Sequence, residues 1–309
     1  MTIAVGGKNL IYYLPLTIAE RLGYFSELGL DVQIVDFAAG SLAVTALVGG
    51  SADVVAGAFE HTLLMQAKGQ ALRAFVLLGR APQIVLGVSQ RLLPDFHGAA
   101  DLKGKRVGVT APGSSTHVLL EYVLTQAGLA PDAAAVIGVG AGASAVAALR
   151  SGQVDALSNL DPAIAILERS GELSVLTDTR SVAESERVFG GPMPGGCLYT
   201  TQRFIDAQPR VTQALTSALV RADAWIARAS LDEIVAAVPP SYLLGDAAVY
   251  RAALGAGRPA LSSDGLIPEG AAETALRALS LLDPVLRTAA LDLRACYTNE
   301  FVRRARAAT

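Results

Sequence analysis

Charged and aromatic side chains are scarce in this chain of 309 residues: 17% are Asp, Glu, Lys or Arg, and 6% are Phe, Trp or Tyr. The net charge is -3, with no run of Lys or Arg and no interleaving of basic and aromatic residues. A nucleic-acid partner requires such a basic surface, so we expect none. The hydrophobic content of 52% excludes a disordered chain, because it suffices for a buried core.

Long apolar runs and metal-type clusters are missing as well. The longest uncharged stretches, residues 37–52 and 133–149, fall short of the roughly 20 apolar residues that span a bilayer. Cys197 and Cys296 lie far apart without metal-ligand spacing, which favours two buried free thiols and leaves a disulfide between them open. The three histidines have no carboxylate or cysteine at ligand spacing. Residues 138–143 (GVGAGA) resemble a dinucleotide-binding turn, but a crowded turn in an Ala-rich sheet explains them as well, so we expect no metal and no cofactor.

The chain does contain short strands that alternate with helices, and many of these helices end at a glycine. Strand–helix–strand order at this spacing predicts parallel sheets flanked by helices. The expected strands are residues 3–5, 32–37, 53–57, 84–89 and 106–110. The expected helices are residues 13–22, 25–28, 41–48, 62–68 and 118–126 and, beyond a Pro- and Gly-rich loop at 190–196, residues 209–228, 231–238, 246–254 and 271–282.

A pattern in the first third of the chain returns in the second. The motif Ala-Leu-x-x-Gly-x-x-Asp occurs at residues 46–53 and again at 148–155, and at the same offset Gly40 corresponds to Gly142. The motif alone is typical of any helix end that turns into a strand, but its flanking elements recur in the same order. The repeat predicts two α/β lobes, the first of residues 1–83 and 196–309 and the second of residues 84–195. Because the second is inserted in the first, two strands are expected to cross between them as a hinge. The C-terminal helices are expected to pack on the first lobe.

Candidate binding residues lie where strands end and helices begin, the edge at which open α/β sheets collect ligands. Ser114, Ser115 and Thr116 follow a strand and open a helix, so their hydroxyls and free N–H groups favour an anion. A simple N-cap needs only one such residue. Gly40 and Ser41 form a matching helix start in the first lobe. The further candidates, for several of which a solvated or structural role is an equal alternative, are Lys8, Tyr12, Glu60, His61, Arg80, Asn159, Asp161 and Met193.

Residues 23–32 (GYFSELGLDV) resemble the opening motif of the nitrate/taurine/sulfonate-type periplasmic binding proteins of ABC importers, a family that also includes thiamine-pyrimidine binders. Shorter matches follow in the same order at residues 50–53, 101–107, 113–117, 152–156, 161–162 and 297–301. The resemblance implies the two-lobe type II periplasmic-binding-protein fold, with a mixed, mostly parallel sheet in each lobe. By position, it also implies ligand contacts in the loops of Ser41, His61, Ser115 and Asp161. Relatives often carry an aromatic residue beside the acidic-Pro pair, and this chain has none there, which leaves the ligand's identity open.

From these features we expect a monomeric substrate-binding protein that closes on a small anionic organic ligand, catalyses nothing, and delivers the ligand to a membrane permease driven by an ATPase. The resemblance implies export to the periplasm, with the leader absent from this sequence; a cytosolic start is the alternative. Two further alternatives stay open. One is a binder of a thiamine-pyrimidine-type heterocycle. The other is an enzyme on the same fold, in which His61 or His117 with Glu60 would supply the base.

Overall fold

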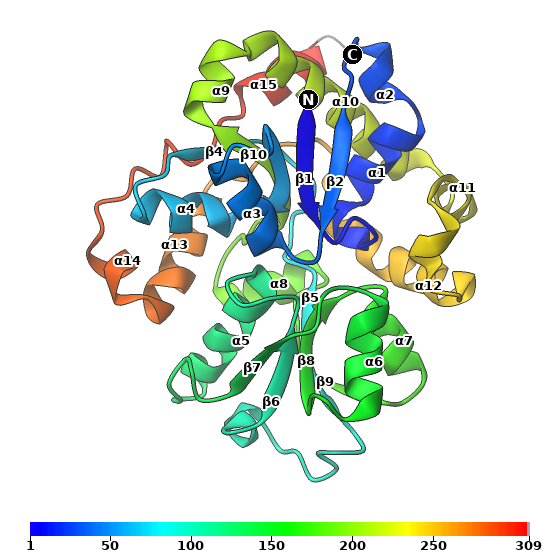
Figure 1. Ribbon diagram of the computed structural model, residues 1–309, viewed down its shortest axis with the longest axis vertical. Helices are drawn as coiled ribbons and strands as arrows, with labels where there is room; N and C mark the ends of the chain where they lie inside the picture. Colours follow the sequence, from blue (N-terminus) through cyan, green and yellow to red (C-terminus); the bar gives the residue numbers. More distant parts are fainter. Residues whose placement is uncertain (308–309) are drawn as a thin grey trace.

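Two five-stranded sheets, one above the other in Figure 1, form the framework of the protein. The computed structural model describes residues 1–307, and its strand orders are β2-β1-β3-β10-β4 and β7-β6-β8-β5-β9. The first sheet contains β1 (Thr2–Gly6), β2 (Gln33–Phe37), β3 (Val54–Ala58), β4 (Leu72–Leu77) and β10 (Gly196–Thr201). The second contains β5 (Ile84–Ser89), β6 (Arg106–Val109), β7 (Ala135–Gly138), β8 (Ala156–Leu160) and β9 (Leu173–Asp178). β10 is antiparallel to β3 and β4, β5 is antiparallel to β8 and β9, and the other pairs are parallel. The predicted α/β class with mixed, mostly parallel sheets is thus confirmed.

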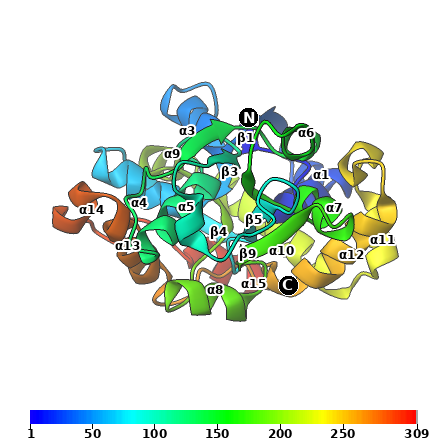
Figure 2. The same cartoon turned by 90° about the horizontal axis from the view of Figure 1, so that it is seen from below.

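Helices flank both sheets (Figures 1 and 2). Around the first sheet lie α1 (Leu14–Arg21), α2 (Tyr24–Glu27), α3 (Gly40–Val48), α4 (Glu60–Ala67), α9 (Gln202–Ala207), α10 (Pro209–Arg228) and α15 (Glu300–Ala307). Around the second lie α5 (Ser115–Gln126), α6 (Ala143–Ser151), α7 (Ala163–Arg169) and α8 (Val182–Phe189). No helix among residues 1–307 is both long and apolar enough to cross a bilayer.

The C-terminal helices occupy the two ends of the molecule in Figure 2: α11 (Leu231–Ala237) and α12 (Ala247–Gly257) at one end, α13 (Ala271–Leu282) and α14 (Pro284–Thr288) at the other. Helix α13 packs against both α4 and α5, and α12 packs against α7. The expectation that these helices pack on the first lobe is therefore incomplete. The apolar faces of α12 and α13 also contact helices beside the second sheet, which the sequence pattern could not assign to a partner.

The internal repeat is confirmed by the strand orders, because β1, β2 and β3 occupy the same places in the first sheet as β6, β7 and β8 in the second. The repeated aspartate makes the same contact in both. Thr2 N donates to Asp53 Oδ2 at 2.7 Å, and Arg106 N donates to Asp155 Oδ2 at 2.9 Å. Each carboxylate thus fixes the start of the strand beside its own.

The chain crosses between the sheets twice, at residues 78–83 and 179–195, and the two crossings lie side by side. Gln83 N donates to the Thr179 carbonyl at 3.0 Å, and the Thr179 hydroxyl bonds to both Ile84 N and Ile84 O at 2.9 and 2.8 Å. We propose that these crossings are the hinge between a lobe of residues 1–83 with 196–309 and a lobe of residues 84–195.

Strand β10 is a correction to the sequence analysis, which expects a mostly helical chain beyond the Pro- and Gly-rich loop and names no strand there. It directly follows the Pro- and Gly-rich loop, and its partners β3 and β4 lie far away in the sequence, so no local pattern pairs it with them. Cys197 on β10 and Cys296 are buried free thiols, which excludes the disulfide. Among residues 1–307, no group of three or more His, Cys, Asp or Glu side chains is arranged to hold a metal ion.

Candidate functional site

The carboxyl ends of the parallel strands of the two sheets face each other across a seam, where α3 and α5 begin (Figure 1). Ser41 lies in the first turn of α3, and Ser114 is the N-cap of α5. The two residues meet. Ser41 N donates to Ser114 Oγ at 3.3 Å, and the Ser114 hydroxyl donates to Ser41 Oγ at 3.1 Å. The Ser41 hydroxyl donates in turn to the Pro112 carbonyl at 3.1 Å. These bonds join the start of α3, beside the first sheet, to the start of α5, beside the second.

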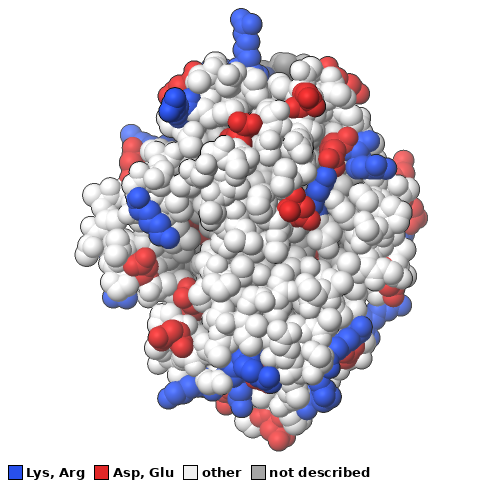
Figure 3. All heavy atoms as spheres, viewed as in Figure 1, with Lys and Arg blue, Asp and Glu red and all other residues white. Residues whose placement is uncertain are grey.

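Further contacts close the seam around this pair. Ile11 N donates to the Asp161 carbonyl at 3.3 Å. Gly142 has a φ of +78°, which favours glycine, and a methyl group added there would lie 2.7 Å from Asn9 Nδ2, so the two loops approach closely at this point. The face over the seam in Figure 3 is mostly uncharged, with the charged side chains gathered towards the rim.

A pocket of about 470 Å³ opens between α3 and α4 beside the seam. Its wall is largely apolar, and Ser41 and Gly113 bring the seam itself into the lining. The lining residues are Ser41, Val44, Thr45, Val48, Gly49, His61, Leu64, Met65, Lys68 and Gly113. Its size lies within the range of small-molecule sites, roughly 300–1,000 Å³.

His61, in the first turn of α4, connects this pocket to the core. Its Nδ1 lies 3.1 Å from the Tyr199 hydroxyl, whereas its Nε2 is buried with no hydrogen-bond partner in the described chain. Burial lowers the pKa of His61 to about 4, although the Gly113 backbone acts in the opposite direction. Burial also raises the pKa of Tyr199, so both groups are neutral at pH 7. In either tautomer Nε2 is left to donate or accept one hydrogen bond at the pocket.

Glu60 is buried beside His61, and burial raises its pKa to about 7. Its negative charge contributes to the raised pKa of Tyr12 and of Cys197, after the larger effect of burial. Tyr12 packs on the start of β10, where a methyl group at Gly196 would lie 3.0 Å from the Tyr12 ring. Tyr12, Glu60 and His61 therefore form one buried cluster behind the seam, but Tyr12 and Glu60 do not line the pocket.

The remaining predicted site residues bond to other parts of the protein or lie apart from the seam. The Thr116 hydroxyl accepts from Thr110 N at 3.0 Å. Asn159 Nδ2 donates to the Gly140 carbonyl at 3.1 Å. Lys8 pairs with Glu20 at 2.7 Å. Exposed Arg80 lines a different pocket, Met193 is buried in the core, and Ser115 is half-buried at the start of α5.

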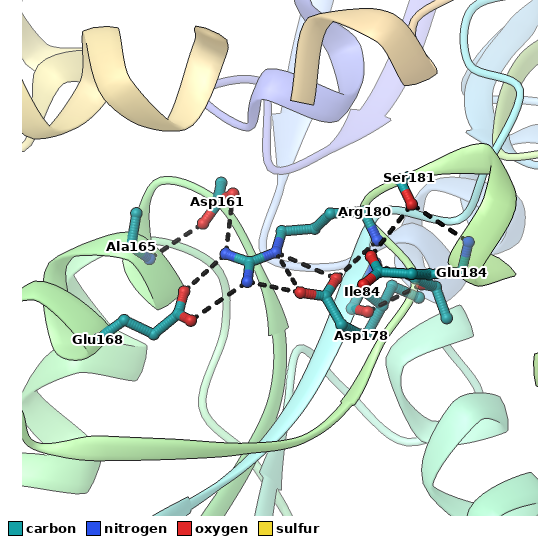
Figure 4. Close-up of polar contacts among 9 residues, drawn as sticks. Ile84, Asp161, Ala165, Glu168, Asp178, Arg180, Ser181 and Glu184 are labelled. Atoms are coloured by element: carbon teal, nitrogen blue, oxygen red, sulfur yellow. Dashed lines mark hydrogen bonds and ion pairs between the residues drawn. The ribbon is translucent and has the colours of Figure 1, made fainter. Parts of the chain in front are cut away.

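Arg180 is a residue of this region that the sequence analysis does not single out. Its guanidinium points between carboxylates in Figure 4, at 2.6 Å from Glu168 and 2.6 Å from Asp178. Asp161 Oδ2 lies 3.6 Å away, and burial raises the pKa of Asp161 to about 6 against the opposing charge of Arg180. Because Arg180 follows β9 on a crossing segment, this cluster links the proposed hinge to the Asp161 loop at the seam. Only its place beside Asp178 in sequence hinted at a pair.

Comparisons with known proteins agree with this architecture. The model described as NMT1-like family matches residues 1–238. A solved protein of Bordetella bronchiseptica RB50 is 57% identical, with a TM-score of 0.98 over 99% of this chain and 96% of that chain. The alkanesulfonate-binding protein SsuA of Xanthomonas axonopodis pv. citri, solved with MOPS, is 23% identical, with a TM-score of 0.73 over 97% and 98% of the two chains. Solved proteins with the periplasmic-binding-protein fold therefore share this fold, which confirms the sequence prediction.

Among sequence relatives, the 4-amino-5-hydroxymethyl-2-methylpyrimidine phosphate synthase of Schizosaccharomyces pombe is 32% identical over 123 residues. That match covers 39% of this chain and 34% of the synthase. The chain thus matches about a third of the synthase's length, so the similarity does not extend to the whole of either protein.

Proposed function

The chain belongs to the NMT1-like family, and on that premise we propose that it is the substrate-binding protein of an ABC importer, with a small anionic organic ligand held between its two sheets. The observation that carries this proposal is the meeting of Ser41 and Ser114 across the seam. Neither hydroxyl caps its own helix. Both donate within the seam instead, Ser114 to Ser41 Oγ and Ser41 to the Pro112 carbonyl, and a ligand would compete for these bonds.

The chemistry of the seam suits an anion. The first N–H groups of a helix have no partner within it, and the helix dipole favours negative charge there. At present Ser41 N donates to the Ser114 hydroxyl. The oxygens of a sulfonate or carboxylate would accept from Ser41 N and from both hydroxyls. These bonds would replace the two that join the serines and the one from the Ser41 hydroxyl to the Pro112 carbonyl. Charge-assisted bonds are the stronger, so the exchange favours the ligand.

Ligand release and capture would follow from motion about the two crossings. A ligand that bonds to both helix starts stabilises the closed arrangement by the contacts that an open arrangement lacks. We place the protein in the periplasm as a monomer, with the permease and ATPase of an importer as partners. SsuA is by its name a binding protein, which supports a binding role rather than catalysis here.

A thermal-shift screen with nitrate, small sulfonates, carboxylates and pyrimidines identifies the ligand class, because bound ligand raises apparent stability. Calorimetry then compares the Ser41→Ala/Ser114→Ala double variant with Ser51→Ala, which removes a hydroxyl that bonds to the Ala46 carbonyl away from the seam. Each charge-assisted bond is worth about 1.5–3 kcal/mol, so the double variant should lose at least tenfold in affinity and the control almost none. Equal affinity in all three proteins contradicts the proposal.

A second candidate function is recognition or conversion of a thiamine-pyrimidine-type heterocycle. The partial match to the synthase supports it, as does buried Glu60, with its pKa of about 7, beside neutral His61. If this candidate holds, the pyrimidine raises the melting temperature when sulfonates and carboxylates do not, and the shift is lost in His61→Ala.

A further inference from the structure

The pocket between α3 and α4 has three chemically distinct parts. At the seam end lie Ser41 and Gly113, and His61 Nε2 is buried there without a partner. The middle is lined by the apolar side chains of Val44, Val48, Leu64 and Met65. At the other end of α4, the Lys68 ammonium is exposed and forms no ion pair with any of residues 1–307.

We propose that this pocket selects an elongated organic dianion: one acid group at the Ser41–Ser114 seam, an apolar body between α3 and α4, and a second acid group beside Lys68. This inference rests on the proposed function and names its ligand class. Nearly all of the lining belongs to the first lobe, with Gly113 as the exception. The apolar body can therefore bind before the seam closes on the first acid group.

Size and spacing support a ligand with a body of this kind. At about 30 Å³ for each water-sized group, a volume of 470 Å³ holds about 15 non-hydrogen atoms. An inorganic anion such as nitrate would leave most of that volume empty. Lys68, the C-cap of α4, follows His61 by seven positions, which is about 10 Å of helix. A chain of about eight carbons with an acid group at each end spans this distance.

Chemical selectivity follows from the lining. The apolar walls favour methylene or aryl groups, and each methylene removed from water is worth about fourfold in affinity. Neutral His61 offers one hydrogen bond without charge, so it accommodates a polar atom next to the first acid group. Because Lys68 is exposed, its contribution is that of a surface ion pair, about two- to fivefold.

Calorimetry with acetate, octanoate and octanedioate tests the proposal on the full chain. Octanoate should bind at least tenfold more tightly than acetate, and octanedioate more tightly again.

Val48→Trp, at a 44% exposed residue, fills the pocket and should lower the affinity for both long acids at least tenfold but leave the affinity for acetate unchanged. The matched control is Val175→Trp, at a 41% exposed residue outside the pocket. Lys68→Met should lose two- to fivefold for octanedioate only, whereas Lys103→Met should change nothing.

The outcomes separate the two proposals. If acetate and octanoate bind equally and Val48→Trp has no effect, the pocket does not hold the ligand, although the anion site at the seam stands. If octanedioate binds no more tightly than octanoate, and Lys68→Met does not change either affinity, the proposal of a second acid group beside Lys68 is wrong. If no acid binds and the Ser41→Ala/Ser114→Ala variant behaves as the wild type, the proposed function and this inference both fail. A melting temperature for each variant excludes loss of folding as the cause.

Discussion

Asp223 lies in the middle of α10 with no exposed surface, and neither of its carboxylate oxygens has a hydrogen-bond partner among residues 1–307. Burial raises its pKa well above the usual value, and the charge of Asp264 adds to the effect. A buried, unpaired carboxylate is costly, so the native state holds this group protonated at a pH where the unfolded chain has released the proton.

The sign of the pH dependence follows from proton binding. Between the unfolded and the folded pKa of Asp223 the native state binds more protons than the unfolded state, so the free energy of unfolding falls as pH rises. The loss is about 1.4 kcal/mol for each pH unit in that interval. Below the ordinary pKa of an aspartate both states are protonated, and the penalty disappears.

Asp223→Asn keeps the shape of the side chain and removes the ionisation. We expect the variant and the wild type to be similar in stability near pH 3.5, and the variant to gain on the wild type steadily as pH rises. Urea unfolding of both proteins between pH 3.5 and 8 measures this difference in stability. The pH-dependent contributions of Glu60 and Asp161 cancel in the difference, because both proteins contain these residues. A difference in unfolding free energy that stays constant from pH 3.5 to 8 would refute the reasoning. It would mean that Asp223 has the same pKa in the folded and the unfolded state. Asp264→Asn removes the neighbouring charge together with an exposed ion pair to Arg306, and it should reproduce a small part of the pH-dependent effect.

Two further predictions concern residues around the seam. Arg180→Gln should destabilise the protein by roughly 3 kcal/mol because it leaves carboxylates unpaired. Arg150→Gln, which breaks a more exposed pair with Glu172, should cost less than about 1 kcal/mol. Equal losses of stability in urea unfolding would argue against the Arg180 cluster. Gly57→Ala places a methyl group 2.5 Å from the Tyr199 hydroxyl, so it should cost about 1–3 kcal/mol and displace the ring from His61, and an unchanged melting temperature would show that the ring is not packed as described.

Much of the architecture could be predicted because local sequence patterns determine it. Glycines at helix ends, strand-length apolar runs and the repeated Ala-Leu-x-x-Gly-x-x-Asp motif give the α/β class and the duplication. The same reasoning finds Ser41 and Ser114, since serines after a strand mark a helix start wherever they occur. Their meeting could not be deduced, because it depends on how one sheet faces the other.

The features that escaped prediction depend on partners distant in sequence. Thr116 looks like part of an anion-binding run, yet its hydroxyl is taken by Thr110, which a list of hydroxyl residues cannot reveal. Arg180 acquires its role only when α7 and the Asp161 loop fold beside it. The α3–α4 pocket depends on how two helices lie against each other, and β10 is inserted antiparallel between β3 and β4. Neither feature produces a periodic pattern in the sequence.

The paired crossings have a consequence for the engineering of the molecule. Gly195 N donates to the Gly79 carbonyl at 2.8 Å, and Leu78 N donates to the Gly196 carbonyl at 2.7 Å, so the points where the inserted half begins and ends already touch. A few linking residues could replace residues 84–195 without stretching the remaining chain, because closing so short a loop has a small entropic cost. The residues that flank the 84–195 segment are therefore natural points at which to delete it or to exchange it for another segment.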